Sequence, residues 1–289
     1  MPPPFGEGLS MPDRPPPQMG LLVRQIGHQN RIFRRVPIAA FFTLAFPLMF
    51  MFLFASIFDD VDIGGGREVA AAQFYAPGLA VFTAASATYT NIGISTAIAR
   101  DEGVLRRVRS TPLPRWVYLG GVVGSGVSIA AFGAALMLSV GIGFYGIEVE
   151  SGRILPAAVT FVVGVASFAM LGLALTAVAP SAQGAPALAQ ATILPAAFVS
   201  DVFMPLGEDP ARWMVLVGDI FPLKPFVHSF FAPFDPFRTG SAWEPEHLLV
   251  IAAWGVFGAV VAAWRFRWEP SVGSGGVRGR RSRRTQSSR

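Results

Sequence analysis

Long runs without a charged side chain dominate the pattern of apolar and polar positions along this chain. Residues 38–58 contain no Asp, Glu, Lys or Arg over 21 residues, and residues 74–99 contain none over 26. Either run can cross a hydrocarbon core about 30 Å thick at about 1.5 Å of helix rise per residue. The run at 154–200 is too long for one crossing, and Pro and Gly residues at 180–186 divide it with a turn. The pattern predicts an all-α integral membrane protein with six spans, at approximately 38–58, 74–99, 116–144, 154–179, 186–206 and 247–265.

Three segments flank these spans. Residues 1–20 are rich in Pro and Gly and lack an apolar run, so we expect a disordered leader. Residues 21–36 alternate apolar and basic positions, which fits an amphipathic helix in the membrane interface; a positively charged stop before the first span is the alternative. Residues 268–289 are rich in Gly, Ser and Arg and predict a disordered basic tail. The basic residues of the interfacial helix are Arg24, Arg31, Arg34 and Arg35.

Composition agrees with a lipid environment. The chain is 52% hydrophobic and 14% charged, whereas about a quarter of the residues in a soluble domain are charged. The net charge of +5 lies beside the apolar runs, where it meets anionic head groups of the membrane lipid, and we expect no nucleic-acid partner. With no cysteine, disulfides and thiolate nucleophiles are excluded.

The basic residues predict the orientation. If the N-terminus is cytoplasmic, 18 of the 23 Lys and Arg residues fall in inner segments. Cytoplasmic loops are enriched in Lys and Arg, so we expect both termini in the cytoplasm. The preference for Arg over Lys, with much Ala, Gly and Val, is typical of a GC-rich bacterial genome and favours the bacterial cytoplasmic (inner) membrane.

The sequence offers no catalytic or metal-binding constellation. His28, His228 and His247 lie far apart and lack a metal spacing such as HExxH. The glycine run at 120–126 is not followed by the Lys-Ser or Lys-Thr of a phosphate loop, so close helix packing explains it better. Asp201 is the only acid near the interior of a span, although an ion-coupled carrier needs ionisable groups there. Energy from a separate ATPase is therefore the better hypothesis.

The segment at 100–115 carries the most informative motif, with a Glu-Gly pair, a short basic helix and Thr-Pro-Leu. It resembles the cytoplasmic loop of type-2 ABC exporter permeases, a bacterial class that exports drugs, lipids and polysaccharides. The resemblance implies a coupling element that docks into the ATPase subunit. A merely positive inner loop is the alternative. The residues implied in coupling are Glu102, Gly103, Val104, Leu105, Arg106, Arg107, Val108, Arg109, Thr111, Pro112 and Leu113.

A second motif follows the fifth predicted span. A Ser-x-x-Phe-x-Pro element, a Trp and a Pro-Leu pair occur in the order that the same family shows, although Asp201 stands where the family usually has Gly. The aromatic residues of this segment suit short outer re-entrant helices between spans five and six. Their implied role is an outer gate, with anchoring in the head-group layer as the alternative. The implied gate residues are Ser200, Asp201, Phe203, Pro205, Trp213, Phe221, Pro222 and Leu223.

The resemblance implies a permease that pairs with a second permease, expected to be a copy of itself, and with cytoplasmic ATP-binding subunits. ATP and Mg²⁺ would bind to that partner, so we expect no cofactor in this chain and no catalysis by it. The phenylalanines of the first span favour an amphipathic drug, as in multidrug resistance, or a lipid or lipid-linked substrate. The rival functions are an ion-coupled carrier that uses Asp201, a membrane-embedded enzyme, and a membrane anchor for a cytoplasmic partner.

Overall fold

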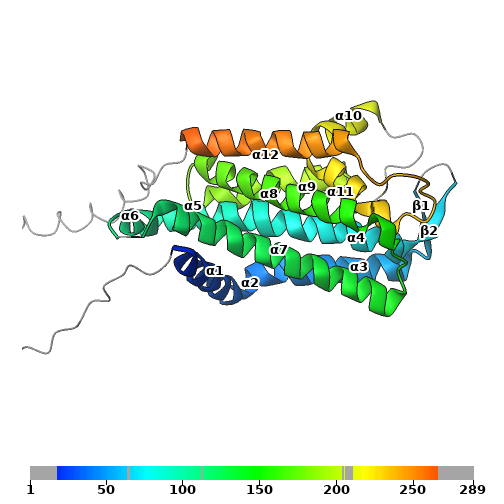
Figure 1. Cartoon of the computed structure of the whole chain (residues 1–289), viewed down its shortest axis with the longest axis horizontal. Coiled ribbons are helices and arrows are strands. Elements are labelled where there is room, and N and C mark those ends of the chain that lie inside the picture. Colours follow the sequence, from blue (N-terminus) through cyan, green and yellow to red (C-terminus); the bar gives the residue numbers. More distant parts are fainter. Residues whose placement is uncertain (1–17, 64–65, 112, 204, 206–210, 266–289) are drawn as a thin grey trace, which may run out of the picture.

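Long helices lie side by side along one axis of the molecule (Figure 1). The predicted leader up to residue 17, the predicted tail at 268–289 and Pro112 lie outside the residues that the structure describes. This structure is a computed structural model, and it describes residues 18–63, 66–111, 113–203, 205 and 211–265.

The first two helical segments are α1 (Gln18–Arg34) and the helix from Pro37 to Ile57. Proline disfavours helical backbone in the residue before it, and the chain leaves the helical conformation at Val36, with φ −109° and ψ 82°. The second helix is continuous but contains a π-helical turn. Its parts are α2 (Pro37–Ala40), η1 (Phe41–Ala45) and α3 (Phe46–Ile57).

The helix at the centre of the bundle runs from Ala71 to Asp101. It consists of α4 (Ala71–Ala85), the π-helical turn η2 (Ser86–Thr90) and α5 (Asn91–Asp101). Every residue of α4 except Phe74 is buried. The small side chains of α4 allow other helices to approach it closely. Its neighbours are α3, α7 (Arg115–Tyr145), α8 (Ile154–Val178) and α11 (Leu223–Phe231).

Helix α12 (Pro245–Arg265) packs along α8 (Figure 1). Glycine makes this approach possible, because a Cβ atom at Gly258 would lie 2.8 Å from the backbone nitrogen of Leu171. Ser167 adds a bond across the same interface by donating to the carbonyl oxygen of Ile251 at 2.7 Å.

The remaining helices are shorter. Helix α9 (Gly184–Phe198) has 15 residues and is about 22 Å long at about 1.5 Å per residue. It ends before the predicted span at 186–206 does. Where short re-entrant helices are predicted, α10 (Arg212–Ile220) is followed by α11 and the 3₁₀ turn η4 (Ala232–Phe234), with a bend of 85° between them.

Four helices among the described residues are long and apolar enough to cross a membrane, or five if the bent pair is one span. The four are 37–57, 115–145, 151–178 and 245–265. The central helix is absent from this group because Gln, Ser, Thr and Asn lower its hydropathy, and α9 because it is short. The described chain is therefore an all-helical membrane protein apart from one hairpin.

That hairpin consists of β1 (Asp60–Asp62) and β2 (Glu68–Ala70), which pair antiparallel with Val61 opposite Val69. Both valines are buried. The hairpin was not predicted. It marks one end of the bundle, called here the hairpin end, while α6 (Val104–Arg109) marks the opposite α6 end (Figure 1).

Candidate functional site

The predicted coupling segment forms a tight turn followed by the short helix α6. Gly103 has φ 74°, in the left-handed region that favours glycine, and reverses the chain after α5. A Cβ atom there would meet nothing within 4 Å, so backbone conformation rather than space selects glycine. The turn leaves Glu102 exposed at the tip of the molecule.

Helix α6 presents two different faces. Leu105 is fully buried in a cluster with Tyr118 and Val122 of α7, whereas the side chains of Arg106 and Arg107 are exposed. Truncating a buried leucine of this kind costs about 2–5 kcal/mol, so Leu105 anchors α6 to the bundle. The arginines remain available to a partner or to lipid. Of the other predicted coupling residues, Val104, Val108 and Leu113 are half-buried, Thr111 is exposed, and the side chain of Arg109 lies outside the described set.

A buried ion pair joins the base of this segment to the next part of the chain. The guanidinium of Arg100 donates to the carbonyl oxygens of Thr176 at 2.8 Å and Ala179 at 3.0 Å, at the end of α8. Asp101 accepts from Arg100 at 3.2 Å and from the backbone nitrogen of Ala182 at 2.7 Å. Hydrogen bonds to charged groups contribute about 1.5–3 kcal/mol each, so α5 is firmly tied to the α8–α9 connection.

Arg100 and Asp101 were not among the predicted site residues. Arg100 is only 5% exposed, and the two carbonyl oxygens that it binds on the α8 side lie more than seventy residues away in sequence. The local sequence therefore carries no signal for this contact beyond the presence of an adjacent acid–base pair.

Helix α1 lies against the glycine face of α7. A Cβ atom at Gly124 would be 2.6 Å from Cδ1 of Ile26, and one at Gly121 would collide with Gln25. Ser125 also donates to the side-chain oxygen of Asn30 at 2.6 Å. The glycine run thus serves close helix packing, as the sequence predicts. The three arginines of α1, Arg24, Arg31 and Arg34, are exposed, and so is Arg35 in the turn that follows.

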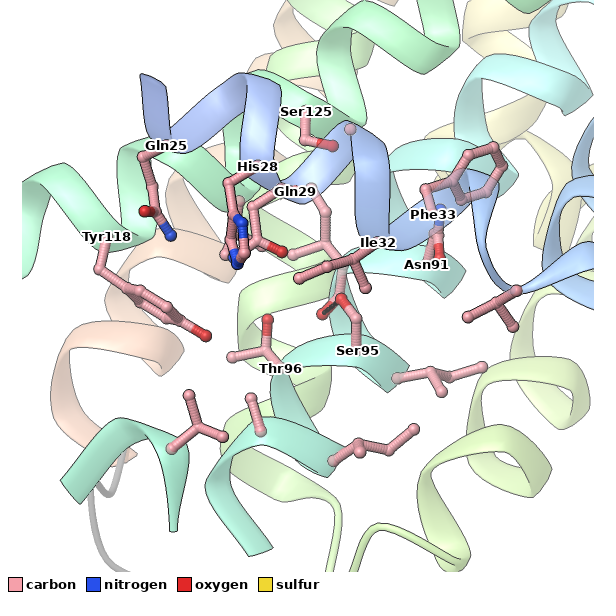
Figure 2. A pocket seen from close by; sticks show the side chains of 18 of the residues that line it. Gln25, His28, Gln29, Ile32, Phe33, Asn91, Ser95, Thr96, Tyr118 and Ser125 are labelled. Carbon is pink, nitrogen blue, oxygen red and sulfur yellow. Dashed lines mark hydrogen bonds between the residues drawn. The ribbon is translucent and has the colours of Figure 1, made fainter. Parts of the chain in front are cut away.

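A cavity of about 480 Å³ separates α1 from the coupling segment (Figure 2). Figure 2 shows Gln29 of α1 above Ser95 and Thr96 of α5, with Tyr118 of α7 at one side. Among the described residues, the hydroxyl of Thr96 is buried without a hydrogen-bond partner, so it can bind water or a polar group that enters. Four predicted coupling residues, Glu102, Val104, Val108 and Leu113, line the cavity.

At the hairpin end, Phe203 joins three helices. Its ring centroid lies 5.7 Å from Phe50 of α3, 5.3 Å from Phe82 of α4 and 5.3 Å from Phe198 of α9. Aromatic pairs at such distances contribute about 0.5–1.5 kcal/mol each beyond their buried area. Ser200 is buried at the end of α9 and donates to the carbonyl oxygen of Ala196 at 2.5 Å.

A polar cavity of about 420 Å³ lies beside this cluster, with Asp201, Pro205 and His228 among its lining residues. Asp201 has φ 56° and forms an ion pair of 2.8 Å with Nε2 of His228 when that ring is protonated. Among the described residues, no three His, Asp or Glu side chains are arranged to hold a metal ion.

Glu244 lines the same cavity and contacts three neighbouring side chains. Its carboxylate lies 2.5 Å from Nδ1 of His247, and it accepts from Ser229 at 2.7 Å and from Arg238 at 2.7 Å. Burial by itself would raise the pKa of Glu244, but the hydrogen bonds from these three side chains outweigh it and lower the pKa to about 2. Glu244 is therefore ionised at neutral pH.

The predicted gate residues do not form one cluster. Phe221 stacks on Trp254 of α12 at 5.4 Å, and Leu223 is buried at the start of α11. Pro222, between them, lines an apolar groove rather than the polar cavity. Trp213 is 62% exposed on α10, away from the aromatic cluster of Phe203.

Comparison with known proteins adds the family. The model of the ABC-2 type transporter family matches residues 22–234, which include most of α1, all of α6 and the turn at Asp201. The chain is similar to the inner membrane transport permease YadH of Escherichia coli K12, with 25% identity over 177 residues, covering 60% of this chain and 68% of that protein. The protein of the same name from Shigella flexneri matches with the same identity and coverage.

Proposed function

Because this chain belongs to the ABC-2 type transporter family, we propose that it is the transmembrane permease subunit of an ATP-driven exporter. It is a multi-pass protein of the bacterial inner membrane. The observation that carries the proposal is α6: Leu105 anchors this helix to the bundle, while Arg106 and Arg107 project outward at the tip. Such a helix suits docking into an ATP-binding subunit, which would hold the ATP and Mg²⁺.

The proposed orientation places the α6 end in the cytoplasm. Exposed arginines of α1, α6 and the end of α12 gather at this end, and basic residues favour the cytoplasmic side. The hairpin end then faces outward. Six crossings follow if the central helix and α9 both span, with the polar residues of the central helix buried against its neighbours.

The proposed coupling runs through rigid contacts. A displacement of α6 would be transmitted through the turn at Gly103 to α5. The hydrogen bonds of Arg100 and Asp101 would then carry it to the end of α8 and the α8–α9 connection. The cavity between α1 and α6 lets the two helices change their separation without breaking a packed core. At the other end, Phe203 lies where α3, α4 and α9 meet, so movement of these helices would open or close that junction.

The proposed substrate is an amphipathic drug, lipid or lipid-linked molecule, moved outward along a path shared with a second copy of the chain. The support is the phenylalanine-rich face of the first span, where Phe41, Phe42 and Phe52 are exposed. Apolar surface of this kind suits either substrate or a partner helix.

An ion-coupled carrier is the weaker candidate. Asp201 lies in the turn after α9 and is paired with His228 at the hairpin end. A coupling ion site needs an ionisable group within the span, reached alternately from both sides. The position of Asp201 favours a role in shaping the outer turn.

The coupling proposal is tested by changing Arg106 and Arg107 together to Glu in vesicles that contain the permease and its ATPase. Reversing both charges should weaken docking, so substrate-stimulated ATP hydrolysis and transport fall at least tenfold while insertion is normal. The change of Arg34 to Glu, on α1, is the matched control for charge at the same end. Unchanged substrate-stimulated hydrolysis in the double variant would refute the coupling role of α6.

A further inference from the structure

An apolar groove of about 450 Å³ runs over α8 between α9 and α12. Leu171, Leu175 and Val178 of α8 form its floor, Leu188 of α9 forms one wall, and Val261 of α12 forms the other. Helix α8 packs against both α12 and α9. A groove of this composition, on a protein that lies in a membrane, is suited to hydrocarbon.

The groove has only a few polar features. Tyr89 and Thr192 bond to each other through their hydroxyl groups at 2.6 Å, so their polarity is satisfied. Arg265 lines the groove at the α6 end and has no hydrogen bond or ion pair within the described part of the chain. None of the described lining residues is acidic. A ligand that fills the groove should therefore pair a hydrocarbon chain with an anion at Arg265.

The length of the groove matches one leaflet. Trp254 closes the far end by stacking on Phe221 at 5.4 Å and by donating from Nε1 to the carbonyl oxygen of Ile220 at 2.7 Å. From Trp254 to Arg265 the axis of α12 rises about 16 Å at about 1.5 Å per residue. Half of a hydrocarbon core about 30 Å thick is about 15 Å. Arg265 therefore lies at the depth of the head groups when the groove lies within one leaflet.

We propose that this groove binds one acyl chain of an anionic phospholipid, whose phosphate lies on Arg265. Arginine suits this role because its guanidinium can bind a phosphate through two parallel hydrogen bonds. With the α6 end in the cytoplasm, this lipid belongs to the inner leaflet, and that assignment rests on the orientation given under the proposed function. The lipid binding itself does not.

A second copy of the chain is the rival occupant, but α9 offers it another face. Leu188 and Thr192 of α9 line the groove, whereas Leu194 and Phe198 are exposed and do not. In an α-helix these pairs point to different sides. A neighbouring protomer can therefore pack on Leu194 and Phe198 while lipid stays in the groove.

Native mass spectrometry of the full chain in mild detergent tests the proposal, with phosphatidylglycerol and phosphatidylcholine of identical acyl chains as probes. The wild type should retain phosphatidylglycerol in preference. Changing Arg265 to Gln should lower phosphatidylglycerol retention about fivefold, the factor that corresponds to about 1 kcal/mol for one basic residue at a lipid surface, and leave phosphatidylcholine unchanged. Changing Leu188 to Trp should fill the groove and lower retention of both lipids.

The matched control is Arg34 to Gln, which removes an exposed arginine at the same end of the molecule outside the groove. Equal retention by the Arg265 variant and the wild type, or an equal loss in the Arg34 variant, would overturn the proposal. So would a Leu188 variant that keeps its lipid but no longer forms dimers, because a second copy would then cover the groove. The experiment measures lipid retention and uses no ATPase or transport assay, so its result does not depend on whether the exporter proposal holds.

Discussion

At the scale of single residues, the backbone conformation of Asp201 explains how an aspartate can stand where the resemblance leads us to expect glycine. The φ of 56° lies in the left-handed region, where glycine is favoured and where Asp and Asn are the side-chain-bearing residues most often tolerated. The resemblance described in the sequence analysis leads us to expect Gly at this position. Asp201 therefore preserves the turn and adds the ion pair with His228.

This account of Asp201 predicts an order of stability among three variants. Asp201→Gly removes the ion pair but suits the backbone, whereas Asp201→Ala removes the pair and also strains the turn by about 1–2 kcal/mol. Asp201→Asn is the control that retains left-handed tolerance without charge. Thermal unfolding in detergent should place Ala below both Gly and Asn. An Ala variant as stable as the Gly variant would contradict the assigned backbone role.

At the scale of helices, the long uncharged runs predicted an all-helical membrane protein but did not reveal features set by distant contacts. After Ser200 and Asp201 the apolar residues resume at Val202 and Phe203, so hydropathy alone does not place the end of the helix at Phe198. The turns η1 and η2 have no sequence signature, because a π-helical turn alters backbone bonding without altering hydropathy.

The hairpin and the buried ion pair were missed for similar reasons. Each strand of the hairpin has only three residues, too few to show a reliable alternation. Arg100 bonds to the end of α8, and that partner cannot be identified from residues near Arg100. By contrast, the glycine run of α7 was interpreted correctly, because small residues on a membrane helix generally mark close packing.

The packing of α1 on α7 gives a prediction at this scale. Gly124→Val should displace α1, because even a Cβ atom there would lie 2.6 Å from Ile26. The native chain has no cysteine, so a single cysteine replacing Gln25 reports whether α1 is docked. Its labelling by a maleimide should become several-fold faster in the Gly124 variant.

Gly143→Val is the matched control on the same helix, because a Cβ atom at Gly143 meets nothing within 4 Å. Labelling at position 25 should keep its original rate in this variant. If the two glycine substitutions changed the rate equally, the glycine face of α7 would have no special part in holding α1.

At the scale of the whole molecule, the positive charge at the α6 end predicts the direction of insertion. A cysteine replacing Ser110, beside α6, should react with an impermeant maleimide only after the cells are opened. A cysteine replacing Ser241, exposed at the hairpin end, should react in intact cells. Labelling with the reverse preference would invert the orientation and separate α6 from any cytoplasmic ATPase.

The all-helical membrane architecture was predictable because lipid imposes long apolar helices, and the family match over residues 22–234 agrees with it. The number of crossings was harder to predict. The central helix buries polar residues against its neighbours, which lowers its hydropathy, and α9 is short for a membrane span. The coupling segment was predicted from its Glu-Gly and Thr-Pro-Leu elements, and its role in coupling stays a prediction; the structure places a short helix there with Arg106 and Arg107 exposed.

The central claim is that α6 joins this permease to an ATP-binding subunit, and copurification measures it most directly. The detergent-solubilised chain is purified from its native host by affinity chromatography, and the proteins that copurify with it are identified by mass spectrometry. A stoichiometric ATP-binding protein is expected with the wild type and with the Arg34→Glu control. Its amount should fall at least tenfold when Arg106 and Arg107 are both changed to Glu. Reproducible absence of such a partner from the wild type, or equal recovery with the double variant, would contradict the account.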